Sequence, residues 1–117
     1  MNNLRNKVQL IGNLGQNPEI RTFDNGRSMA KFSLATSESY RDSSGKKILE
    51  TQWHNIVAWG PIVKTIEKHF LKGTGIALEG KLIHRVWEDK DGKKRFITEV
   101  VLNDFMLLKP KETETEE

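Results

Sequence analysis

The sequence predicts an all-β protein, a small barrel of antiparallel strands with a single helix late in the chain. Three observations carry this prediction. Apolar residues alternate with polar ones over several short segments. Asn-Gly and Asp-Gly pairs, which favour tight hairpin turns, stand between such segments at 25–26 and 91–92. Only the segment after Pro61 spaces its apolar residues as a helix does.

The first predicted strand spans Lys7–Asn13. Gly12 and Gly15 stand at its end, where a strand can bend sharply or another backbone can approach closely. The second strand, Glu19–Phe23, and the third, Ser28–Thr36, are joined by an Asp-Asn-Gly turn. These segments therefore predict one strand followed by a hairpin.

The polar segment Ser37–Glu50 is either a loop or an extended hairpin with its tip at 43–47. The next strand, Thr51–Trp59, is expected to pair with the third strand across it. Its alternation places Trp53 and Trp59 on one face. These two indoles are therefore expected to be buried together or exposed together.

One helix follows a Gly-Pro pair. Pro61 suits the first helical position, where its missing N–H costs nothing. Ile62, Ile66 and Phe70 form an apolar stripe at helical spacing, which indicates packing on a sheet. Gly73 is expected to end the helix at the C′ position.

The last two strands are Ile76–Trp87 and Phe96–Leu108, joined by an Asp-Gly turn. Alternation along the first of them predicts four inward side chains, Ile76, Leu78, Leu82 and Val86. Three phenylalanines follow the apolar periods and are expected in the core, namely Phe32, Phe70 and Phe96.

This order predicts an OB-fold, a five-stranded Greek-key barrel with one α-helix between strands 3 and 4. An SH3-like barrel or a small α+β sandwich would give almost the same pattern. With 117 residues, 36% of them hydrophobic, the chain is expected to form one domain over residues 1–108. Residues 109–117 are expected to form a short acidic disordered tail.

The net charge of +3 is unevenly distributed. Residues 1–111 carry all 19 Lys and Arg but only 12 of the 16 Asp and Glu, a net charge of +7. Residues 112–117 carry the other four acids and no base, a net charge of −4. A basic body of this kind favours a polyanionic partner.

Enzymatic chemistry finds little support in the sequence. The absence of cysteine excludes disulfides, thiolate zinc sites and cysteine nucleophiles. The three histidines share no metal-ligand spacing, and neither a nucleophile elbow nor a carboxylate pair placed for acid–base work is found. No enzyme activity, cofactor or metal is therefore expected. No apolar run approaches the roughly 18 residues that span a bilayer, and a cytoplasmic location is expected.

Four aromatic residues stand among polar or charged neighbours, namely Tyr40, Trp53, Trp59 and Trp87. Large aromatic side chains are usually core residues, which is the alternative for each of them. If exposed, they would stack on nucleobases with little sequence preference. Nearby cations would then neutralise phosphates, and the candidates are Lys7, Arg21, Lys72, Lys81 and Arg85.

Several motifs in register resemble the bacterial single-stranded DNA-binding protein family across residues 4–108. They are Asn6–Val8, Gly12–Glu19, Leu34–Asp42, Thr51–His54, Leu71–Gly73, Leu78–Leu82, Trp87 and Thr98–Val101. The resemblance implies an OB-fold, sequence-independent binding of single-stranded DNA, and a homotetramer. It implies a role in replication, recombination and repair, at the bacterial nucleoid. The alternative is an OB-fold protein-interaction module that binds no nucleic acid.

The resemblance also implies roles for single residues. The aromatic positions 40, 53, 59 and 87 would stack on bases, and His54 would lie at a subunit interface. Relatives often carry a basic residue at the positions of Pro61 and Val86, so some phosphate contacts are expected elsewhere. The family typically ends in Asp-Asp-Asp-Ile-Pro-Phe, which docks replication and repair enzymes. The sequence ends at Glu117 without this tip, so the resemblance does not extend to recruitment through it.

Overall fold

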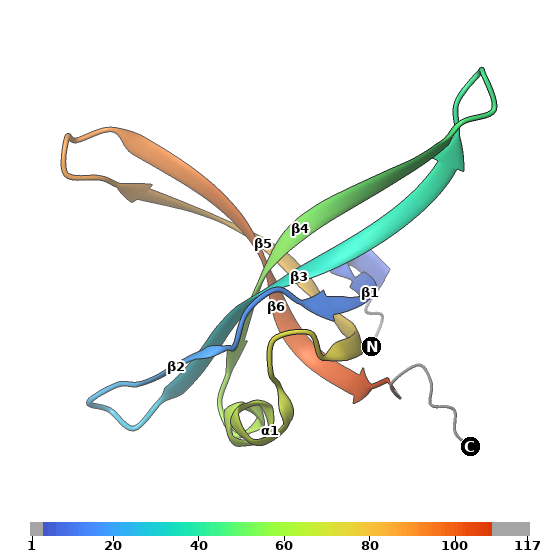
Figure 1. Cartoon of the computed structure of the whole chain (residues 1–117). Helices are drawn as coiled ribbons and strands as arrows, with labels where there is room; N and C mark the ends of the chain where they lie inside the picture. The colour runs from blue at the N-terminus through green and yellow to red at the C-terminus, as the bar shows by residue number, and fades with distance from the viewer. Residues whose placement is uncertain (1–3, 109–117) are drawn as a thin grey trace, which may run out of the picture.

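The computed structural model describes residues 4–108, and the predicted acidic tail lies outside them. The chain forms a barrel from which long hairpins project (Figure 1). A short 3-10 helix, η1, opens the described chain. The elements are η1 (Leu4–Asn6), β1 (Val8–Leu14), β2 (Glu19–Thr22), β3 (Ser28–Arg41), β4 (Lys47–Trp59), α1 (Ile62–His69), β5 (Gly75–Glu88) and β6 (Lys94–Leu107).

Five strands form the barrel in the order β1-β5-β6-β4-β3, and pairing of β3 with β1 closes it. The closing contact is short, since only Asn13 and Leu14 of β1 pair with β3. The β4–β6 pairing is parallel and the others are antiparallel. The short strand β2 pairs with β3 alone and stands outside the ring. The predicted OB-fold is confirmed, because α1 lies between the third and fourth strands of the ring.

Two glycines allow barrel strands to approach closely. A Cβ atom on Gly12 would lie 2.1 Å from the carbonyl oxygen of Ala35 on β3. A Cβ atom on Gly80, at the register shift between β5 and β6, would lie 2.2 Å from the carbonyl oxygen of Val101. Both neighbours are backbone atoms, which cannot move aside as a side chain can. The expected close approach at Gly12 is therefore confirmed.

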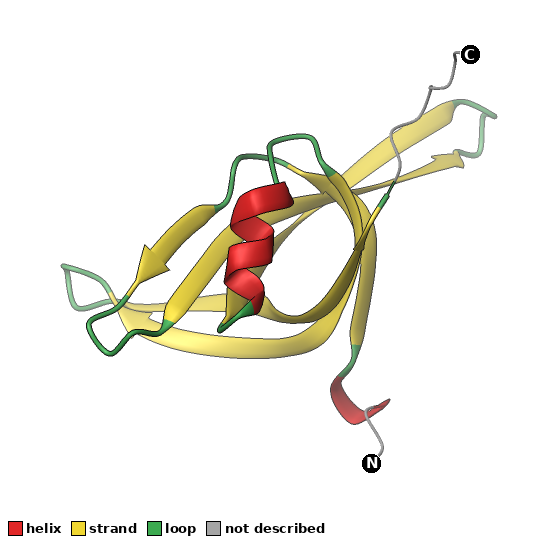
Figure 2. Cartoon of the chain, turned by 90° about the horizontal axis from the view of Figure 1, so that it is seen from below, coloured by secondary structure: helices red, strands yellow, loops and turns green. Residues whose placement is uncertain are grey.

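Helix α1 covers one end of the barrel (Figure 2). Val63 and Ile66 face the core, and Pro61 stands at the N-cap. The helix ends at His69, so the expected end at Gly73 is wrong. Phe70 takes an extended conformation (φ −96°, ψ 126°), and its ring is buried. No helix in the described part of the chain is long and apolar enough to cross a membrane.

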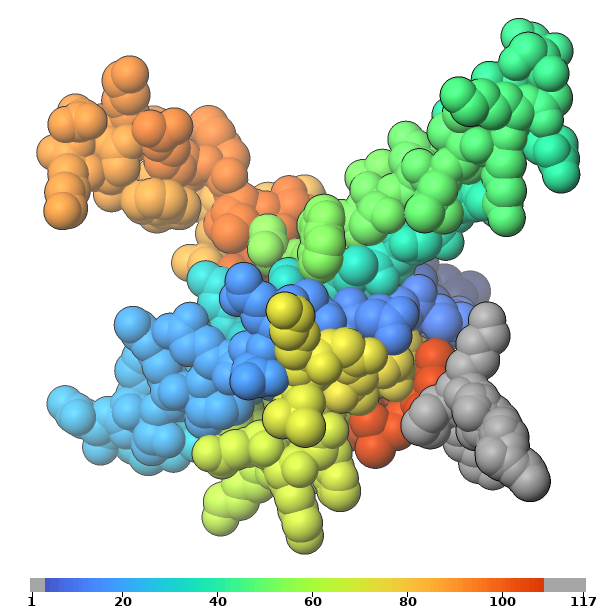
Figure 3. Space-filling view, viewed as in Figure 1, coloured from blue at the N-terminus to red at the C-terminus, as the bar shows by residue number. Residues whose placement is uncertain are grey.

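Two antiparallel arms extend beyond the barrel, β3–β4 and β5–β6 (Figure 3). The segment 37–50 is thus the extended hairpin, with its turn between Arg41 and Lys47. Because the β5–β6 arm leaves the barrel, no second layer covers its apolar residues. Leu82, Val86 and Phe96 are exposed, Phe96 by 77%, so their predicted burial is wrong. Alternation sets the face of a side chain but not whether another layer lies opposite.

The tips of both arms have the same hydrogen-bond pattern around an aspartate. Asp42 Oδ1 accepts from the backbone N–H groups of Ser44 and Lys46 at 2.9 Å. Asp89 Oδ1 accepts in the same way from Asp91 and Lys93. The hydrogen bond from the Ser44 hydroxyl is the main cause of the lowered pKa of Asp42, and that from the Lys93 N–H lowers the pKa of Asp89. Each tip is therefore organised by an ionised carboxylate.

Acidification is expected to loosen the arm tips. Because the folded pKa of each aspartate is lowered, its stabilising contribution is complete above the ordinary value of about 3.9 and is lost as pH falls through the folded pKa. Amide chemical shifts of Ser44 and Lys46, followed by NMR from pH 6 to pH 2, measure this loss. Asp42→Asn should show the low-pH shifts already at pH 6. Tip amides that do not change while Asp42 titrates would contradict the prediction.

Candidate nucleic-acid interface

A groove of about 380 Å³ runs over the outer face of the sheet between the β2–β3 hairpin and the β5–β6 arm. These two elements lie on the left of Figure 3. The groove combines cationic, aromatic and aliphatic side chains. It is lined by Arg21, Phe23, Met29, Lys31, Val57, Trp59, Ile83, Arg85 and Glu99. Three residues predicted from the sequence, Arg21, Trp59 and Arg85, are thus brought together from three different strands.

Trp59 is held at the groove by two residues of the β2–β3 turn. Its ring stacks with Phe23 at a centroid distance of 5.9 Å. The guanidinium carbon of Arg27 lies over the Trp59 ring, 4.5 Å from its centroid. The backbone N–H of Phe23 donates to the carbonyl of Arg27, which joins the two neighbours. Trp59 therefore has a fixed position and stays partly exposed.

An ion pair forms one wall of the groove. Arg85 Nε and Nη2 donate to the two carboxylate oxygens of Glu99, each at 2.9 Å. Glu99 is buried, with 3% of its surface exposed, whereas about half of the Arg85 side chain is exposed. The hydrogen bonds that Arg85 donates to Glu99, and then the negative charge of Glu99, raise the pKa of Arg85. The guanidinium is thus fixed from behind and open in front.

Trp53 lies on β4 directly opposite Ala35 of β3, with 63% of its surface exposed. Gly15 provides the space beneath its indole. A Cβ atom on Gly15 would lie 2.4 Å from Trp53 Cζ3 and 2.9 Å from the hydroxyl oxygen of Ser33. The ring thus rests against the chain after β1, and most of it faces outward.

The other two aromatic candidates lie on the arms, and both are exposed. Trp87 lies two residues beyond Arg85, so it shares the strand face of that residue. Tyr40 pairs with Ile48, an odd number of positions from the pair Ala35–Trp53, so the register places it on the opposite strand face from Trp53. None of the four aromatic candidates is buried, contrary to the core alternative.

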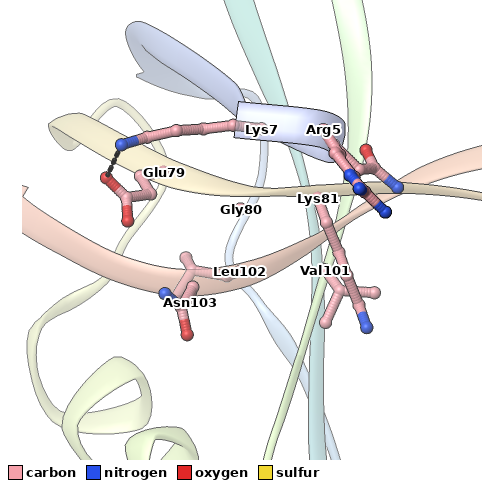
Figure 4. Close-up of a pocket in the computed structure, with 9 residues that line it drawn as sticks. Arg5, Lys7, Glu79, Gly80, Lys81, Val101, Leu102 and Asn103 are labelled. Carbon is pink, nitrogen blue, oxygen red and sulfur yellow. Dashed lines mark ion pairs between the residues drawn. The ribbon is translucent and has the colours of Figure 1, made fainter. Parts of the chain in front are cut away.

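A second hollow, also of about 380 Å³, lies between η1, β5 and β6 (Figure 4). Lys7 Nζ lies 3.3 Å from a carboxylate oxygen of Glu79 at one end. Arg5 and Lys81 also line the hollow, and neither forms an ion pair within residues 4–108. The hollow therefore carries a net positive charge. The remaining predicted cation, Lys72, lies apart in the turn after α1, where its N–H donates to Asn17 Oδ1.

His54 is half-buried on β4, with its Nε2 atom 2.9 Å from the hydroxyl oxygen of Thr36. Its place at a subunit interface stays a prediction. Within the described residues, no three His, Cys, Asp or Glu side chains gather in a way that could hold a metal ion.

Comparison with known proteins decides the family. The model of the single-strand binding protein family matches residues 5–108. The chain belongs to the single-strand binding protein family. Single-strand binding proteins are DNA-binding proteins and not enzymes.

Individual members of the family agree in sequence and fold. Single-stranded DNA-binding protein 1 of Chlorobaculum tepidum is 44% identical over 109 residues, which are 92% of this chain and 67% of the relative. The Plasmodium falciparum SSB, solved in complex with ssDNA, is 36% identical with a TM-score of 0.82, over 93% of this chain and all of that one. A single-stranded DNA binding protein from Thermus aquaticus is 27% identical with a TM-score of 0.79, over 91% of this chain and 51% of that one.

Two residues of the groove, Phe23 and Glu99, and the Arg27 neighbour of Trp59 were not predicted from the sequence. Arg27 acts on Trp59 from the neighbouring hairpin, a contact that strand alternation does not reveal. The sequence does mark Glu99 as unusual, because it is a lone carboxylate in the mostly apolar run 96–102. A charge in such a run indicates a buried ion pair, although its partner can be found only from the register.

Gly15→Ala is expected to displace the Trp53 indole and to weaken binding of oligo-dT about fivefold, by partial loss of one stacking surface. The added methyl group would overlap Cζ3 of the indole. Tryptophan emission and a binding titration measure the two effects. Gly75→Ala is the matched control, because its new Cβ would meet no atom closer than 3.3 Å. Unchanged emission and affinity in Gly15→Ala would contradict this role of the glycine.

Proposed function

We propose that this chain binds single-stranded DNA without sequence preference and protects it during replication, recombination and repair. The observation that carries the proposal is the groove, where Trp59 lies among Arg21, Lys31 and Arg85 on one open face. Aromatic rings stack on any base, and cations neutralise the adjoining phosphates. The fold likeness to the Plasmodium SSB, which was solved with ssDNA, supports the same function.

In this proposal the four exposed aromatics, Tyr40, Trp53, Trp59 and Trp87, stack on bases of the single strand. Arg21, Lys31 and Arg85 hold the backbone in the groove. Lys7, Lys72 and Lys81 contact phosphates outside it. The existing ion pairs do not oppose this role, since Arg21–Glu19 (3.7 Å) and Lys7–Glu79 are both partly exposed. Exposed pairs contribute little to stability, so a phosphate can replace the carboxylate at small cost.

A fluorescence titration with oligo-dT, against a duplex of equal length, tests the proposal. Single strands should quench tryptophan emission and bind more tightly than duplex, with affinity that falls as salt rises. Unchanged emission, or equal affinity for duplex, would favour the interaction-module alternative.

We further propose that the chain acts as a homotetramer in the bacterial cytoplasm, at the nucleoid. The edge of β1 supports self-association. Its residues Val8–Gly12 pair with β5 on one side, and within the described residues no strand pairs with their other edge. An open strand edge of this kind can pair with a second copy.

His54→Lys is expected to shift the assembly toward smaller species, because a lysine at an interface loses hydration without a partner. Light scattering at micromolar concentration measures the mass. His69→Lys, at an exposed position at the end of α1, is the control. A monomeric parent protein would contradict the tetramer. A tetramer that persists in folded His54→Lys would remove this residue from the interface.

A further inference from the structure

Glu99 presents a problem that DNA binding alone does not explain. It is the one buried charged residue in the described part of the chain, and it borders the groove proposed for a polyanion. Burial of a carboxylate is costly unless the charge is paired. A negative charge at this place also repels phosphates. Its presence therefore calls for a role that outweighs both effects.

The β5–β6 register explains how Glu99 meets its partner. Glu99 lies directly opposite Ile83, and Arg85 lies opposite Ile97. Arg85 and Glu99 are thus diagonal neighbours on the same strand face, within reach of long side chains. The carboxylate accepts one hydrogen bond from Nε and one from Nη2. A guanidinium has five N–H donors, so three of them remain.

These remaining donors border the groove. Arg85 lines the groove together with Trp59 and Lys31, and no other hydrogen bond or ion pair of its side chain is found within residues 4–108. The geometry therefore separates two sides of one guanidinium, a side bound to Glu99 and a side available to a ligand. Fork-shaped donors of this kind match the oxygens of a phosphate.

We propose that Glu99 is a positioning residue, which holds Arg85 in the orientation that receives a phosphate of the single strand beside the base stacked on Trp59. The inference rests on the proposed function and adds a division of labour among its cations. Glu99 neutralises the charge of Arg85, so Arg85 contributes directed hydrogen bonds, whereas Lys31, which forms no ion pair within residues 4–108, contributes net charge. An orientation fixed before binding lowers the ordering cost of association.

Glu99→Gln tests the proposal, because it keeps the shape of the side chain and removes its charge. At high salt, where charge attraction is screened, the variant should bind oligo-dT about tenfold more weakly. This is the loss expected when Arg85 is no longer oriented and its charge-assisted hydrogen bond to the phosphate is weakened. The log–log salt dependence of the variant should become steeper by about 0.7, because Arg85 then acts as one additional free cation. A merely structural role would leave the affinity of the folded variant at high salt unchanged.

If Glu99 acts through Arg85, the effect of Glu99→Gln on the affinity for oligo-dT should change sign in an Arg85→Ala background. Without the guanidinium, Glu99 is an unpaired anion in the groove, so its neutralisation should then raise affinity. Arg85→Lys, which keeps the charge and loses the fork, should bind more weakly than the parent at high salt. Lys90→Ala removes an exposed cation from the tip of the same arm and is the matched control.

Two results would overturn the proposal. One is Glu99→Gln binding as tightly as the parent or more tightly at high salt, and the other is the same sign of effect with and without Arg85. If thermal melting shows that Glu99→Gln is unfolded, folded Arg85→Lys decides, and parental affinity in that variant counts against the proposal. Failure of the parent protein to bind oligo-dT would instead overturn the proposed function itself.

Discussion

Trp53→Ala is expected to weaken binding of oligo-dT by about ten- to a hundredfold while the thermal midpoint stays close to that of the parent. The indole is 63% exposed, so its removal takes little buried surface from the core. Loss of one stacked base corresponds to about 1–3 kcal/mol. Binding titration and thermal melting of the same preparation separate the two quantities.

Two variants control this result. Trp53→Phe keeps an aromatic face and should retain most of the affinity, whereas Leu49→Ala removes an exposed apolar side chain from the same strand and should have no effect on binding. A lowered thermal midpoint in Trp53→Ala would mean that the ring stabilises the fold through its contact with the chain at Gly15. Unchanged affinity in a folded Trp53→Ala would remove the residue from the interface.

Phe70→Ala is expected to lower the free energy of unfolding by about 3–5 kcal/mol, the usual cost of removing a buried phenylalanine. The ring is 1% exposed. It meets Phe32 of β3 and Phe105 of β6 edge-on, at centroid distances of 5.4 Å and 4.8 Å. It therefore joins the end of α1 to two walls of the barrel, and its loss leaves a cavity bordered by both.

Urea denaturation measures this loss. The neighbouring Leu71 is 64% exposed, so Leu71→Ala should change the free energy of unfolding by less than about 0.5 kcal/mol. The pair of variants separates burial from sequence position. Equal effects at both positions would contradict the place of Phe70 in the core.

The order of the elements could be predicted from the sequence because alternation and turn residues are local signals. Whether a given side chain lies inside the barrel or beyond its end could not be predicted in this way. Leu82 and Phe96 follow the same alternation as buried Leu78, yet the strands carry them past the end of the barrel. The end of α1 could not be predicted for a similar reason. The helix stops at His69, because Phe70 adopts an extended conformation that places its ring in the core, three residues before Gly73.

The candidate site divides in the same way. The polar neighbours of Tyr40 and Trp87 indicated exposure, and both rings are exposed. The contacts of Arg85 with Glu99 and of Arg27 with Trp59 depend on strand register and hairpin geometry, which join residues far apart in the chain or across a turn. Such partners need the three-dimensional arrangement, whereas exposed aromatic and basic candidates can be found from the sequence alone.

The two arms have a consequence for the energetics of local unfolding. Beyond the barrel each arm consists of one ladder of backbone hydrogen bonds and a tip, with exposed side chains such as Tyr40 and Val86. Elements with few buried contacts open at a small fraction of the global free energy. The two strands of each arm can therefore separate and pair again while the barrel stays closed. A ligand held across an arm would have to be released before that arm opens, so its binding energy would add directly to the protection of the arm.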